Sequence, residues 1–183
     1  MIINREWAMP NSKTFKINHI KMLIKKYLPT AGGIVLDPFA NEHSIKEIMY
    51  QIKYISNDID VSYKCDYSLE AQKFLNLFDN NTIDLILYDP PYSQRQVKEV
   101  YTKLKKTVTK KDTQSDYWVK FKKEIKRVLK PNGICISFGW DSNGIGKNNG
   151  FKITEILLLA HGGAHNDTIC TVEIKKHHQE SLF

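Results

Sequence analysis

The residues best suited to take part in chemistry are adjacent in the sequence, at Asp89-Pro90-Pro91-Tyr92. Asp89 supplies a carboxylate and Pro90 keeps its backbone carbonyl, so two hydrogen-bond acceptors lie close together. Pro91 restricts Pro90 to an extended backbone and stiffens the turn, while the ring of Tyr92 offers a surface on which a planar group could stack. The segment therefore offers two hydrogen-bond acceptors and an aromatic ring close together. The simpler alternative is that the prolines end a strand and the tyrosine packs.

Three more carboxylates, Asp37, Asp58 and Asp66, each follow a short apolar segment that we expect to be a strand. Carboxylates at strand ends can accept hydrogen bonds from ligand hydroxyls and amines. An aspartate after a strand can also cap the next helix or turn. Taken together, the three predict a ligand site.

The apolar pattern also predicts the elements that must position these residues. We expect strands at residues 33–36, 53–56, 63–65, 83–88, 134–138, 153–160 and 168–174, and helices at 44–50, 69–78 and 117–129. Strands that are almost wholly apolar and alternate with helices indicate a mostly parallel sheet covered on both faces. The last two strands are joined by a glycine-rich segment typical of an antiparallel pair. Ligands bind such sheets beyond the carboxyl ends of the strands.

Length and composition narrow the class of protein. The chain has 183 residues, about one domain, with a formal charge of +7 that suits a polyanionic partner or simply a basic surface. We expect no membrane span and no secretory signal. Three cysteines without a paired motif argue against disulfides and a cysteine zinc site, and favour the cytoplasm. Among the six histidines, His161 and His165 lack a carboxylate partner at ligand spacing and His177-His178 is a polar tail, so we expect no metal.

Two motifs together resemble a known family. Asp37-Pro38-Phe39-Ala40 followed by Asp89-Pro90-Pro91-Tyr92 is similar to the paired motifs of the S-adenosylmethionine-dependent DNA amino-methyltransferases, most of all the small adenine-N6 enzymes of phages and mobile elements. The stretch from Trp7 to Ile24 resembles the segment that precedes the first motif in some of these enzymes. The resemblance covers most of the chain and implies one domain, residues 1–183, with the class I (Rossmann-like) methyltransferase fold: a three-layer α/β sandwich around a seven-stranded, mostly parallel sheet with an antiparallel last strand.

The resemblance also implies roles for individual residues. Asp37 would lie near the methionine amino group, Asp58 would hold the ribose with Asp60 as its competitor, and Asp66 would lie near the adenine amino group. The implied set of S-adenosylmethionine-binding residues is Phe15, Asp37, Pro38, Phe39, Ala40, Asp58 and Asp66. Family members often have glycines after the first motif, where this chain has Asn41-Glu42-His43-Ser44, and these side chains could crowd the methionine end.

The family's chemistry accounts for the second motif. An exocyclic amino group on adenine is a poor nucleophile because its lone pair is delocalised into the ring. Acceptors at Asp89 and Pro90 would favour a more tetrahedral nitrogen, and Tyr92 could stack on a base removed from the duplex. With Pro91 stiffening the turn, these four residues form the expected catalytic set.

A basic segment follows the expected catalytic turn. Residues 95–130 contain thirteen Lys and Arg against four Asp and Glu. We interpret the lysines of the 117–129 helix mainly as a solvated face, and the looser stretch 93–114 as the part that contacts phosphates. The expected nucleic-acid-binding residues are Arg95, Gln96, Lys98, Lys103, Lys105 and Lys106.

Only nine residues follow the last expected strand, so we expect no separate target-recognition domain and low sequence selectivity, unless a partner protein or a second copy supplies recognition. The expected activity is methyl transfer to adenine N6 in DNA. Three alternatives stay open: cytosine N4, an RNA adenine, or a nucleic-acid-binding module with a degenerate cofactor pocket.

Overall fold

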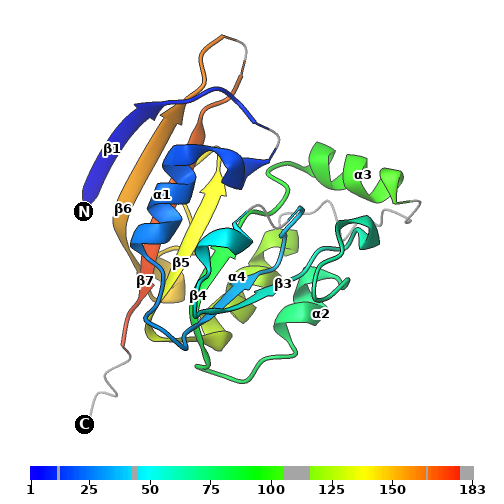
Figure 1. The fold of residues 1–183 in the computed structure, drawn as a ribbon, viewed down its shortest axis with the longest axis vertical. Helices are drawn as coiled ribbons and strands as arrows, with labels where there is room; N and C mark the ends of the chain where they lie inside the picture. The colour runs from blue at the N-terminus through cyan, green and yellow to red at the C-terminus, as the bar shows by residue number, and fades with distance from the viewer. Residues whose placement is uncertain (12, 43–44, 105–115, 164, 178–183) are drawn as a thin grey trace.

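The computed structural model describes residues 1–11, 13–42, 45–104, 116–163 and 165–177. A seven-stranded sheet runs through it in the order β1-β6-β7-β5-β4-β2-β3 (Figure 1). The strands are β1 (Ile2–Trp7), β2 (Ile34–Asp37), β3 (Lys53–Ser56), β4 (Ile83–Tyr88), β5 (Leu129–Gly139), β6 (Phe151–Ala160) and β7 (Thr168–Lys175). The α-helices are α1 (Asn18–Lys26), α2 (Ala71–Leu75), α3 (Gln94–Lys103) and α4 (Asp116–Val128).

Most neighbouring strands run parallel. β2 pairs in parallel with β3 and β4, β4 with β5, and β1 with β6. β7 is antiparallel to both of its neighbours, β5 and β6. The expected mostly parallel, seven-stranded sheet with an antiparallel last strand is therefore confirmed.

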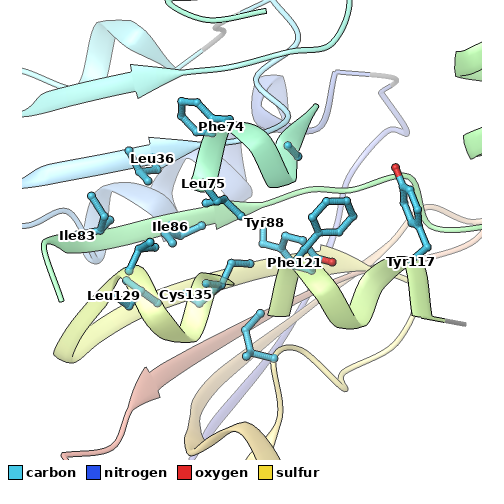
Figure 2. Packing of buried hydrophobic residues seen from close by; sticks show 14 of the residues in the cluster. Leu36, Phe74, Leu75, Ile83, Ile86, Tyr88, Tyr117, Phe121, Leu129 and Cys135 are labelled. Atoms are coloured by element: carbon cyan, nitrogen blue, oxygen red, sulfur yellow. The ribbon is translucent and has the colours of Figure 1, made fainter. Parts of the chain in front are cut away.

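Helices cover both faces of the sheet because successive side chains of each strand point to opposite faces. Val35 and Leu85 pack on one face with α1, while Leu36 and Ile86 pack on the other with α2 and α4. Figure 2 shows the second of these layers, in which Phe74, Leu75 and Phe121 face the strands. The result is the expected three-layer sandwich.

The expected strand at residues 63–65 is wrong. The Asp60 side chain accepts a hydrogen bond from the Ser62 backbone N–H (3.0 Å) and begins a 3-10 helix, η3 (Val61–Tyr63). Lys64 then adopts a left-handed backbone with φ of 51°. Only an isolated bridge between Asn57 and Tyr67 remains at this edge. The seventh strand is instead β1, at the opposite edge of the sheet.

The helices follow the sequence pattern unevenly. The helix expected at 117–129 is confirmed as α4, but the one at 69–78 shortens to α2. Within the described part of 44–50 there is only a 3-10 turn, η2 (Lys46–Ile48). The stretch expected to be loose begins with a regular helix, α3, and its remainder at 105–115 lies outside the described residues. No helix in the described ranges is long and apolar enough to cross a membrane.

Candidate active site

A cavity of about 360 Å³ opens at the carboxyl ends of β2, β3 and β4. Its walls come from the loops after these strands and from α3 and the start of α4. Residues from both motifs line it, as does an aspartate from the loop after β3: Pro38, Phe39, Asp58, Asp89, Pro90, Pro91 and Tyr92. The two motifs, which lie far apart in the sequence, therefore border one cavity.

Contacts from two helices fix the Asp89–Tyr92 turn. The Trp118 Nε1 of α4 donates to the Pro91 carbonyl (3.0 Å), and the Tyr92 backbone N–H donates to Gln96 Oε1 of α3 (2.6 Å). None of the described residues donates a hydrogen bond to the Pro90 carbonyl oxygen. Within the described residues this oxygen therefore has no donor, and Pro90 itself borders the cavity.

Tyr92 faces Asp89 with its hydroxyl and Trp140 with its ring. The hydroxyl donates to Asp89 Oδ1, and the ring meets the Trp140 ring edge-on, with the centroids 5.6 Å apart. Trp140, which follows β5, is not among the residues that line the cavity. Trp140 therefore packs against Tyr92 without bordering the cavity itself.

Burial raises the pKa of two neighbouring carboxyls, those of Asp37 and Asp89, by different amounts. Loss of hydration raises the pKa of Asp89 to about 6, against a lowering effect of hydrogen bonds from Tyr92 and Thr14. Loss of hydration raises the pKa of Asp37 to about 8; a bond from Tyr54 opposes this, and repulsion from Asp89 adds to it. Asp89 therefore ionises at a lower pH than Asp37.

Asp37 is fully buried beneath the loop that follows β2. Its carboxyl meets the Tyr54 hydroxyl (2.8 Å) and the Phe39 backbone N–H (3.3 Å), and it does not line the cavity. Its observed contacts shape the loop that carries Pro38 and Phe39. The resemblance implied that Asp37 would lie near the methionine amino group, but these contacts do not bring Asp37 to the cavity.

Asp58 and Asp60 both line the cavity. Asp58 accepts hydrogen bonds from the backbone N–H groups of Asn41 (3.1 Å) and Asp60 (2.8 Å), which fix its carboxylate after β3. Asp60 lies 3.6 Å from the Lys103 ammonium, and hydrogen bonds from Ser62 together with Lys103 keep the pKa of Asp60 below its usual value.

Asp66 lies outside the cavity lining. Its carboxylate accepts from the Ser56 backbone N–H (2.8 Å) and Ser56 hydroxyl (2.7 Å), so it ties its loop to the end of β3. The acidic residue that does line this part of the cavity is Glu70, which accepts from the Tyr101 hydroxyl (3.0 Å). Sequence reasoning missed Glu70 because no expected strand precedes it directly.

In the loop after Phe39, an asparagine takes the left-handed backbone conformation that a glycine would adopt most easily. Asn41 adopts φ of 50°, a left-handed conformation that asparagine tolerates better than most residues. The buried Asn57 amide donates to the carbonyls of Pro38 (3.0 Å) and Leu69 (3.0 Å) and clamps the loop from below. Sequence reasoning missed Asn57, although its place between β3 and Asp58 was the available signal.

A side cavity of about 30 Å³ adjoins this loop and is lined by Phe15, Phe39, Ala40 and Asp89. Phe15 itself is buried and packs edge-on against Phe138, with centroids 5.0 Å apart. It therefore belongs mainly to the core beside the loop, and its neighbour Thr14 lines the larger cavity.

The basic residues expected to bind nucleic acid take different positions. Arg95 pairs with Glu99 (2.8 Å) on the exposed side of α3, and Lys98 is exposed nearby. Lys103 and Gln96 line the cavity. Lys105 and Lys106 lie outside the described residues. Four of the six thus lie on a helix that borders the cavity, where Glu99 and Asp60 partly offset the charges of Arg95 and Lys103.

No protein-family model and no curated protein matches the chain, whereas solved structures do. TrmN from Thermus thermophilus has a TM-score of 0.58 at 17% identity over 87% of this chain, which spans about half (49%) of TrmN. The 1,6-didemethyltoxoflavin-N1-methyltransferase of Burkholderia thailandensis, solved with S-adenosylhomocysteine, has a TM-score of 0.60 at 10% identity, covering 86% and 76% of the two chains. A methyltransferase of Haloferax volcanii, in complex with the Trm112 methyltransferase activator, has a TM-score of 0.56 at 12% identity, covering 87% and 90%. The chain therefore has the class I S-adenosylmethionine-dependent methyltransferase fold.

Proposed function

We propose that this protein transfers a methyl group from S-adenosylmethionine to the exocyclic N6 of adenine in DNA. The observation that carries the proposal is the shared cavity: Asp89 and Pro90 border the same space as Phe39 and Asp58. A donor held by the loops after β2 and β3 would then lie next to acceptors suited to an aromatic amine.

The cavity fits S-adenosylmethionine in size and chemistry. Its volume of about 360 Å³ lies in the usual range for small-molecule sites. Asp58 and Asp60 present carboxylates that can accept hydrogen bonds from ribose hydroxyls, and Phe39, Ile59 and Leu69 supply apolar wall. When bound, the cofactor supplies an electrophilic methyl group on a sulfonium.

The turn after β4 would activate the amine. Asp89 Oδ and the Pro90 carbonyl would each accept a hydrogen bond from the amino group and so draw its lone pair out of conjugation with the ring. Because Trp118 and Gln96 hold the turn, the acceptors need little rearrangement as charge develops. As the nitrogen gains a methyl group it loses a proton, and ionised Asp89, with a pKa of about 6, can accept that proton.

The nucleic-acid part of the proposal rests on the Asp-Pro-Pro-Tyr motif and on the basic chain. The motif indicates an amino nitrogen in a planar system, and the net charge of +7 favours a polyanion. Target recognition would come from α3 and the segment after it, or from a partner subunit.

The test is mass spectrometry of nucleosides from DNA and RNA incubated with the protein and labelled S-adenosylmethionine. We expect N6-methyladenine in DNA. Label found only in N4-methylcytosine or in RNA would move the activity to one of the alternative substrates.

Two variants separate chemistry from cofactor binding. Asp89→Ala should reduce transfer at least about a hundredfold with little change in S-adenosylhomocysteine affinity by calorimetry, whereas Asp58→Ala should weaken that affinity. Asp79→Ala, at an exposed position outside the cavity, is the control for both. No calorimetric binding, together with intact DNA binding, would instead favour a nucleic-acid-binding module.

A further inference from the structure

A second concave site lies at the opposite end of the sheet from the candidate active site. Its volume is about 770 Å³, and it is bounded by the end of α4, the turn before β4, the region before β6 and the end of β7. Tyr117 at the start of α4 lines the first cavity, and Arg127 near its end lines the second. A helix rises about 1.5 Å per residue, so roughly 15 Å of α4 separates these two residues. We call this site the basic cleft.

The cleft has a strong excess of positive charge. Its lining includes Lys123, Lys126, Arg127, Lys147, Lys175 and Lys176, and none of its described lining residues is Asp or Glu.

Two of these cations have structural partners. Arg127 pairs with Glu124 (2.6 Å) and bonds to backbone carbonyls, and Lys175 donates to Asn81 Oδ1 (2.8 Å) and to the Leu129 carbonyl (2.6 Å). Burial, and to a smaller extent repulsion from Lys126, lowers the pKa of Lys175.

The other four lysines of the cleft differ from Arg127 and Lys175 in their ion pairing. Across the described ranges, no carboxylate forms an ion pair with Lys123, Lys126, Lys147 or Lys176. Gathering these ammonium groups in one concavity costs free energy through repulsion, and an anion seated there would remove that cost.

The other residues that line the cleft indicate which kind of anion it would bind. Side-chain amides of Asn80, Asn81, Asn148 and Asn149 add donors and acceptors, and Gly150 takes a left-handed backbone with φ of 86°. No Phe, Tyr or Trp is among the lining residues, so the cleft offers no such ring for stacking bases. Ammonium and amide groups without aromatic rings suit phosphate oxygens, and they are indifferent to base sequence.

We propose that the basic cleft binds the phosphate backbone of nucleic acid, as a second and sequence-independent contact remote from the catalytic turn. The binding does not depend on methyl transfer, because the cleft shares no lining residue with the candidate active site. It would hold a long polyanion on the protein while another part of the strand reaches the first cavity.

The test compares two triple variants that change the net charge equally. The cleft variant is Lys123→Gln/Lys126→Gln/Lys147→Gln. The control is Lys25→Gln/Lys53→Gln/Lys73→Gln, at exposed positions outside both cavities. Binding of a short fluorescein-labelled DNA of mixed sequence, single-stranded and duplex, is followed by polarisation over a salt series without cofactor. Melting temperatures verify that each variant is folded.

We expect the cleft variant to bind DNA on the order of tenfold more weakly at physiological salt, with a log-log salt slope about two to three smaller than that of the unaltered protein. The control should stay within about twofold. The corresponding Lys→Arg triple variant should keep the affinity, because guanidinium also binds phosphate.

Three results would overturn the proposal: equal losses in the two Gln variants, no loss in either, or loss of inorganic tripolyphosphate binding with DNA binding intact. The last would assign the cleft to a free polyphosphate. Because no cofactor is present, a failure here is distinct from an absence of methyl transfer, which leaves this binding unchanged.

Discussion

Asp37 and Asp89 end neighbouring strands, yet their surroundings prepare them for different tasks. Burial raises the pKa of both, to about 8 and about 6, but Asp89 keeps contact with the cavity and Asp37 does not. Asp37 holds the loop through its contacts with Tyr54 and Phe39, and Asp89, which ionises at the lower pH, is the carboxyl that can accept hydrogen bonds at the cavity.

The hydroxyl of Tyr92 affects the pKa of Asp89 directly. It donates to the ionised carboxylate and so opposes the effect of burial on the pKa of Asp89. Tyr92→Phe keeps the ring against Trp140 but removes this bond, so the pKa of Asp89 should rise. In the proposed mechanism transfer requires ionised Asp89, so the acid limb of the pH–rate profile, expected near pH 6, should move to higher pH.

The expected size is a loss of about threefold at pH 6 relative to the unaltered protein, with little change at pH 8. Single-turnover methylation over pH 5 to 9 measures it. Tyr50→Phe, on an exposed side chain remote from the site, serves as the control. An acid limb that moved to lower pH in Tyr92→Phe would contradict the role given to Asp89.

At the scale of elements, α3 and α4 determine how well the Asp89–Tyr92 turn is held. Trp118 of α4 bonds to the Pro91 carbonyl, and Gln96 of α3 accepts from the Tyr92 backbone. From the sequence, Gln96 was expected to bind nucleic acid, and Trp118 was given no role at this turn. Neither role could be read from the sequence, because both contacts depend on how the helices pack against the end of β4.

Trp118→Phe tests the contribution of α4. The ring volume is largely kept, but the bond to Pro91 is lost, so the acceptors at Asp89 and Pro90 should become less well aligned. We expect the rate of transfer to fall about tenfold, with S-adenosylhomocysteine affinity within about twofold. Single-turnover kinetics and calorimetry give the two values.

Val119→Phe, at a neighbouring exposed position on α4, is the control for a change on the same helix. An equal loss of rate and of cofactor affinity in Trp118→Phe would indicate general damage to the cavity and would exclude a specific role in positioning the turn.

The elements also show which parts of the fold could be predicted. β2 and β4 are almost continuous apolar runs, so their type and position followed from the sequence, and the topology rule then placed Asp58 and Asp89 correctly at one edge. β1 gave no such signal, because all six of its residues are exposed and their pattern is mixed. In α3 only Val97 and Tyr101 are buried, which is too little apolar spacing to distinguish a helix from a loop.

At the scale of the whole molecule, β1 is attached to the sheet through a buried carboxylate. Glu155 of β6 is only 2% exposed and accepts hydrogen bonds from Tyr27 (2.5 Å), Lys26 (2.6 Å) and Asn4 (3.0 Å). These donors come from the last residue of α1, the residue that follows it, and β1, so one side chain joins three elements. Against the opposing effect of burial, the bonds from Lys26 and Tyr27 hold the pKa of Glu155 below its usual value.

Glu155→Ala should therefore lower the free energy of unfolding by about 2–4 kcal/mol, because it leaves the Tyr27 hydroxyl and the Asn4 amide without their acceptor and removes the partner of Lys26. Because the pKa of Glu155 is lower in the folded protein than in the unfolded chain, its stabilising contribution is present at neutral pH and disappears as the pH falls through the folded value. Urea unfolding at pH 7 and at acidic pH measures both effects.

Glu6→Ala in β1, where the carboxylate is exposed and only 3.8 Å from His19, is the matched control and should change stability by less than about 0.5 kcal/mol. If Glu155→Ala were no less stable than this control at pH 7, β1 and α1 would be held by backbone pairing and apolar packing alone.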